Sequence, residues 1–72
     1  MKLQYYPETD SLYIDLSGRV SSESREISEG VVLDYDAEGM LVGIDIDNAS
    51  HKVDLDIFKL SHLPGRIETD AA

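Results

Sequence analysis

The sequence has no cysteine, no tryptophan and no long hydrophobic run. Without cysteine, no disulfide or thiolate-metal site can stabilise this chain of 72 residues. No apolar run approaches the length that spans a bilayer, and MKLQYYPETD has neither the apolar core nor the small-residue cleavage site of a signal peptide. We therefore expect a soluble, cytoplasmic protein with no membrane contact, whose thin core gains stability from a partner or from self-association.

Basic side chains are also scarce. Six Lys and Arg stand against 15 Asp and Glu, which gives a formal net charge of −9. Because this charge repels phosphate backbones, we expect no direct nucleic-acid binding. Most of the charge lies in residues 23–50, where acidic side chains greatly outnumber the single arginine. Such a concentration indicates either a solvated acidic face that keeps the domain soluble or a surface for a basic partner.

Alternating apolar residues predict four antiparallel strands in two hairpins. The first hairpin joins residues 2–6 to residues 12–16 through PETDS, in which proline and aspartate favour a turn. The second joins residues 25–35 to residues 40–47 through DAEG, and Gly30 within the longer segment indicates a bulge or a bend. One face of this predicted sheet collects apolar side chains: Leu3, Tyr5, Leu12, Ile14, Leu16, Leu33, Val42, Ile44 and Ile46.

The last third of the chain changes its period. Asp54 can cap a helix whose apolar residues, among them Leu55 and Phe58, fit a spacing of 3.6 better than strand alternation. The Pro-Gly pair after Leu63 ends this predicted helix. VDLDI does alternate, so a fifth strand is the alternative for residues 53–60.

These elements predict a fold of the α+β class. It consists of a four-stranded antiparallel meander, made of two hairpins, with one short C-terminal helix on one face. Residues 1–63 would form a single small β-rich domain and residues 64–72 a flexible tail.

The stretch DYDAEGMLVGID, residues 34–45, nearly matches the calcium loop of an EF-hand. We do not expect calcium there, because both flanks are predicted strands and the last position holds Asp45 instead of the longer glutamate. His51 and His62 lack the close ligand pairs of a zinc site, and no nucleophile motif surrounds any serine. We therefore expect a protein that is not an enzyme and has no metal or cofactor, and we rank a metal-binding module last.

A helix on one face leaves the other face and both sheet edges open, which predicts a dimer, a higher oligomer or a complex with another chain. Apolar side chains that point away from the predicted core either cover each other across strands or form an interface. The candidate contact residues combine these with the acidic residues of the second hairpin: Tyr13, Val32, Leu41, Asp34, Asp36 and Glu38.

Several segments together resemble a small prokaryotic family, the domain of unknown function family 2283. They are YPETDSLYIDL (residues 6–16), EGVVLDYD (residues 29–36), then Gly39 and VGIDI (residues 42–46) followed by NAS. The resemblance covers roughly residues 2–60 and implies a compact β-rich domain with a short C-terminal helical segment. It defines no catalytic or binding residues. Some members are similar to proteins encoded beside small toxin-like partners, which implies an antitoxin role.

The leading hypothesis is thus a non-catalytic interaction protein, an antitoxin-like subunit that neutralises a small basic partner. The acidic segment would meet the basic surface and apolar burial would hold the complex. The alternative is a self-assembling structural homo-oligomer without a ligand, with Tyr13, Val32 and Leu41 at its interface.

Overall fold

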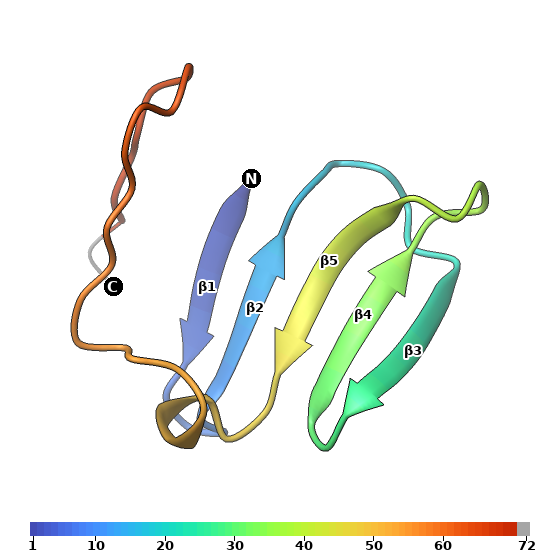
Figure 1. Ribbon diagram of the computed structural model, residues 1–72, viewed down its shortest axis with the longest axis horizontal. Coiled ribbons are helices and arrows are strands. Elements are labelled where there is room, and N and C mark those ends of the chain that lie inside the picture. The colour runs from blue at the N-terminus through green and yellow to red at the C-terminus, as the bar shows by residue number, and fades with distance from the viewer. Residues whose placement is uncertain (71–72) are drawn as a thin grey trace.

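The computed structural model describes residues 1–70, which form one antiparallel sheet of five strands and a single 3-10 helix (Figure 1). In chain order the elements are β1 (Lys2–Tyr6), β2 (Ser11–Asp15), β3 (Glu23–Ser28), β4 (Val31–Tyr35), β5 (Leu41–Ile46) and η1 (Ala49–His51). In space the strands lie in the order β1-β2-β5-β4-β3. The fold is therefore nearly all β.

The β1–β2 and β4–β5 hairpins correspond to the two predicted hairpins. They lie side by side because β2 pairs with β5, which places Ile14 opposite Ile44 and Leu12 opposite Ile46. The connection from β2 to β3 crosses one end of the sheet and reaches its far edge (Figure 1). From there the chain returns through β4 to β5 in the centre of the sheet.

The prediction of four strands is wrong, because residues 25–35 are not one strand. Gly30 lies in the tight turn between β3 and β4 with φ 72°, a conformation that glycine adopts without strain. The Gly30 N–H donates to the Glu26 carboxylate at 3.2 Å across this turn. Every residue of β3 is exposed, so the strand has no buried face and no apolar alternation by which to recognise it.

The predicted C-terminal helix is absent from the described residues, and residues 53–60 form no strand either. After η1 the chain continues as an irregular segment, residues 53–70, which we call the C-terminal segment. His62 has φ 59°, a left-handed conformation that would interrupt a helix reaching Leu63. A ten-residue helix is only marginal without a surface to pack on, and this segment lies beside the sheet (Figure 1). No helix within residues 1–70 is both long enough and apolar enough to cross a membrane.

The register divides the side chains of the sheet between two faces. On one face, which we call the apolar face, Ile44 lies between Ile14 of β2 and Leu33 of β4. On the other, which we call the acidic face, Asp45 lies between Tyr13 and Val32. The apolar face holds the residues predicted for the core. No helix or second sheet within residues 1–70 covers either face (Figure 1).

Because the sheet is a single layer, the protein has almost no hydrophobic core. Val42 and Ala49 are the buried hydrophobic residues, at 3% and 0% exposure. The other apolar side chains of the central strands are half-buried. At the β1 edge Leu3 and Tyr5 are 41% and 42% exposed. A sheet with an open apolar face of this kind is usually completed by another layer.

Candidate interaction surfaces

The acidic face is organised by a hydrogen-bonded chain that joins residues of three strands, β2, β4 and β3. The Tyr13 hydroxyl on β2 reaches over β5 and donates to Asp34 Oδ2 on β4 at 2.9 Å. The Ser24 hydroxyl on β3 donates to Asp34 Oδ1 at 2.6 Å. Both carboxylate oxygens of Asp34 are thus bonded within the sheet.

Gly43 makes this arrangement possible, because the Tyr13 ring lies directly over it. A Cβ atom at Gly43 would stand 2.7 Å from Tyr13 Cζ and closer still to the hydroxyl oxygen. Glycine is therefore required for close approach here, and the ring in turn covers backbone that glycine would leave exposed to water. Gly43 is buried as a result.

Ionisation on this face reflects the crowding of negative charge. The hydrogen bond to Asp34 raises the pKa of Tyr13 to about 12, with further contributions from burial and from Asp34, Asp15 and Asp45. The pKa of Asp45 is raised by burial first, and then by the charges of Asp47 and Asp34. A positive group placed here would reduce the repulsion between these carboxylates.

Asp36, in contrast, is a structural residue of the β4–β5 turn and is 8% exposed. Its Oδ1 accepts the N–H groups of Glu38 and Met40, both at 2.9 Å. Its Oδ2 lies 2.9 Å from Nε of Arg19, in the connection between β2 and β3. The bond from Met40 is the main reason that the pKa of Asp36 is lowered, with Glu38 and Arg19 acting in the same direction.

The structure brings together three of the six residues predicted to make contacts. Tyr13, Val32 and Asp34 share the acidic face. Leu41 does not join them, because a register shift between Asp34 and Tyr35 places it opposite Tyr35, on the apolar face.

The remaining two lie in the β4–β5 turn, where Glu38 is exposed and Asp36 is buried. Asp34 and Asp36 already accept hydrogen bonds within the chain. Asp45 is the acidic residue at the centre of the acidic face, and in the register it lies opposite both Tyr13 and Val32. The alternation of β5 alone did not identify Asp45 as a candidate contact residue.

The apolar face continues into a groove of about 1020 Å³ beside the C-terminal segment. Sequence reasoning missed the side of the groove that the C-terminal segment forms, because it predicted this segment to be a helix over the sheet. Phe58 is 64% exposed in the observed arrangement. The apolar lining comes from both sides: Leu3, Tyr5, Leu12 and Ile14 from the sheet, and Leu55, Phe58, Leu60 and Leu63 from the segment.

Asp10 fixes the place where the C-terminal segment leaves the sheet. Its carboxylate accepts the hydroxyls of Tyr5 at 2.8 Å and Ser50 at 2.6 Å, and its carbonyl accepts the Ala49 N–H at 2.8 Å. These bonds attach η1 to the end of the β1–β2 hairpin. The Ser50 hydroxyl is the main cause of the lowered pKa of Asp10, followed by Tyr5.

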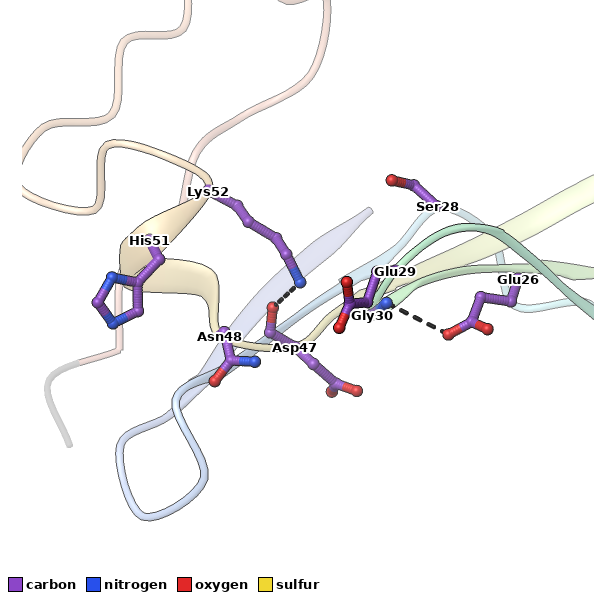
Figure 2. A pocket seen from close by; sticks show the side chains of 8 residues that line it. All are labelled: Glu26, Ser28, Glu29, Gly30, Asp47, Asn48, His51 and Lys52. Atoms are coloured by element: carbon purple, nitrogen blue, oxygen red, sulfur yellow. Dashed lines mark hydrogen bonds between the residues drawn. The ribbon is translucent and has the colours of Figure 1, made fainter.

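A second, polar hollow lies between η1 and the β3–β4 turn (Figure 2). There the Lys52 ammonium donates to the Asp47 carbonyl at 2.5 Å, and Figure 2 shows the His51 ring directed away from that bond. No group of three or more His, Asp or Glu side chains in the described part of the chain is arranged to hold a metal ion. Two side chains of the hollow bind backbone there: Glu26 accepts the Gly30 N–H and Lys52 donates to the Asp47 carbonyl.

A comparison with protein families finds a model described as Protein of unknown function (DUF2283) that matches residues 2–50. The matched region runs from β1 into η1, so it contains the whole sheet and stops before the C-terminal segment. Neither the curated proteins nor the solved structures yielded a match.

Proposed function

Because the chain belongs to the DUF2283 family, whose description names no activity, we propose a function from the two faces of its sheet: it is a non-catalytic protein-interaction domain. The observation that carries the proposal is the open apolar face. A single-layer sheet that leaves this face uncovered has its binding surface already formed.

The acidic face supports a more specific role, that of an antitoxin-like subunit that neutralises a small basic partner. Tyr13 and Val32 flank Asp45 there and supply apolar surface next to carboxylates. The carboxylates would raise the association rate and select a basic partner, while the apolar surface would be buried in the complex. The similarity of some family members to proteins encoded beside small toxin-like partners supports the same role.

Occlusion is the mechanism that this arrangement suits. The acidic face would lie over the basic surface of the partner and block its access to substrate, without any covalent chemistry by the interaction domain. Burial is the main cause of the raised pKa of Asp45, and the charges of Asp47 and Asp34 add to it. A cationic group of the partner would oppose the contribution of these charges.

Purification of the tagged protein from its own host at low and moderate salt tests this role. We expect a stoichiometric small basic protein that dissociates as the salt concentration rises, because exposed charges are screened. Asp45→Lys should weaken the complex at least tenfold. Glu8→Lys, an equal change of charge in the exposed β1–β2 turn, serves as the control and should have little effect. Binding that ignores salt, or equal loss in both variants, would rule out the acidic face as the contact.

A further inference from the structure

The folded chain exposes more surface than a complete domain of its mass. Its accessible surface is 5894 Å². A folded monomer of 8.0 kDa is expected to expose about 4450 Å². The difference, on the order of 1400 Å², comes from the open sheet and from the exposed C-terminal segment.

This surplus includes a continuous apolar surface that spans four strands. Two rows of paired residues cross β1, β2, β5 and β4 on the apolar face. Neither row contains a charged residue before it reaches the β3 edge, where Arg25 follows Leu33. The four strands place the ends of each row about 14 Å apart. The rows are Leu3–Ile14–Ile44–Leu33 and Tyr5–Leu12–Ile46–Val31.

We propose that a second copy of this chain covers the apolar face, so that two sheets pack face to face in a homodimer. This inference rests on the proposed function, since it names the occupant of the open face. A stable dimer needs about 800 Å² buried on each copy, and the surplus is large enough to supply that area.

Charge favours the same occupant. The acidic groups that surround Tyr13 and Asp45 project from the opposite face, so they remain outside when two apolar faces meet. Packed sheets lie about 10 Å apart, and the outward-pointing carboxylates of the two copies are more widely separated still. Since the Debye length is about 8 Å at physiological salt, most of their repulsion is screened. A basic protein, by contrast, would gain no electrostatic attraction from the uncharged rows.

The C-terminal segment bounds one side of the interface. It leaves the sheet at η1 and runs beside β1 (Figure 1), and its apolar side chains line the groove there. At the opposite edge the rim is charged, with Arg25 paired to Glu23 at 3.2 Å and its guanidinium 5.2 Å from the centre of the Tyr35 ring. A polar rim such as the one at the β3 edge is typical of protein interfaces.

The test is the native mass of the full chain, measured by light scattering during size exclusion at micromolar concentration. We expect twice 8.0 kDa for the wild-type protein. Ile44→Lys, at the centre of the apolar rows, should weaken dimerisation at least a hundredfold. Val32→Lys on the neighbouring strand, directed to the acidic face, is the matched control and should leave the mass unchanged.

Because Ile44→Lys can also unfold so thin a domain, a milder pair of variants decides the interface. The chain has no cysteine, so Ile44→Cys and Val32→Cys each introduce a single thiol. A short bismaleimide linker should join two copies through Ile44→Cys and not through Val32→Cys. The reverse pattern would overturn the proposed interface.

A dye that fluoresces on exposed apolar surface separates this inference from the proposed function. A monomeric wild-type protein that binds the dye would overturn the homodimer and leave the apolar face available to another protein. A monomeric protein that does not bind the dye would have this face covered by its own chain, which would overturn both the homodimer and the open binding face.

Discussion

The contact between Tyr13 and Gly43 offers the sharpest test of how this sheet is stabilised. Replacing Gly43 with alanine puts a methyl group 2.7 Å from Tyr13 Cζ. The methyl group is bonded directly to the strand backbone and cannot rotate away, so the Tyr13 ring must move. Its hydrogen bond to Asp34, 2.9 Å long, is then lost.

The expected free-energy change has two opposing parts. A hydrogen bond to a charged group contributes about 1.5–3 kcal/mol, and the lower end applies here because Tyr13 is only half-buried. Alanine in place of glycine within a strand recovers about 0.5–1 kcal/mol of backbone entropy. We therefore expect Gly43→Ala to lower the free energy of unfolding by about 1 kcal/mol.

A double-mutant cycle with Tyr13→Ala isolates the cause. Once the ring is absent, Gly43→Ala should stabilise the sheet by about 0.5–1 kcal/mol, which gives a coupling of about 2 kcal/mol between the two positions. Urea unfolding at one fixed protein concentration measures each variant, because self-association would make stability depend on concentration. Gly18→Ala is the control, since its Cβ would meet nothing within 4 Å. If Gly43→Ala costs the same with and without the Tyr13 ring, the steric explanation is wrong.

Three further predictions concern single carboxylates and the Tyr13 phenol. Asp36→Ala removes the acceptor of two backbone N–H groups and the partner of Arg19, and urea unfolding should show a loss of about 1–3 kcal/mol; an unchanged midpoint would contradict the turn-fixing role. Because the pKa of Asp45 is raised in the folded state, the folded state binds more protons than the unfolded state between pH 3.8 and the raised value. The contribution of Asp45 to the free energy of unfolding therefore falls as the pH rises through this window. Asp45→Asn should therefore stabilise the protein at pH 7 and lose this advantage below pH 3.8, as thermal melts across pH would show; equal melting shifts at both ends would refute it. Because the pKa of Tyr13 is about 12, an ultraviolet titration should show one tyrosine that ionises at higher pH than an ordinary tyrosine, and Tyr13→Phe should remove this step. If the step remains in the variant, it belongs to another tyrosine.

The strands that sequence reasoning recovered are those with one apolar and one polar face. Alternation marks β2 and β5 clearly, because Leu12, Ile14, Ile44 and Ile46 all point to the same side. β3, which the prediction merged with β4, is exposed along its whole length, and its one apolar side chain is Ile27. Its pairing with β4 therefore comes from the tight turn at Gly30, a residue that the sequence analysis interpreted as a bulge or a bend.

The helix prediction failed because local signals were given more weight than the surface that a helix needs. Asp54 and the Pro-Gly pair after Leu63 resemble the two ends of a helix, but both 2.0 and 3.6 periods fit the residues between them. Most of the stability of a short helix comes from tertiary packing of its apolar side. The segment instead follows the β1 edge from its attachment at Asp10 (Figure 1).

The candidate contacts were predicted in part, for a similar reason. The alternation of β2 and β4 placed Tyr13 and Val32 on one face, away from the predicted core. It could not show that the Tyr13 hydroxyl reaches Asp34, since the two residues lie on strands separated by β5. Asp36 did carry a signal, because an aspartate that opens a turn ending in glycine often binds the backbone two residues ahead, as it does at Glu38.

The division of charge between the two faces also explains how assembly would stop at two copies. An uncovered apolar sheet with open edges invites indefinite association. Face-to-face pairing is isologous, so it uses up the apolar face of both copies and leaves only acidic faces outward. With a net charge of −9 on each chain, further stacking of dimers would bring like charges together. The edges are limited as well, because β3 has a register shift between Glu26 and Ser28, and the C-terminal segment runs beside β1. In the proposed dimer, the acidity that limits further growth would also leave both outer faces available to a basic partner.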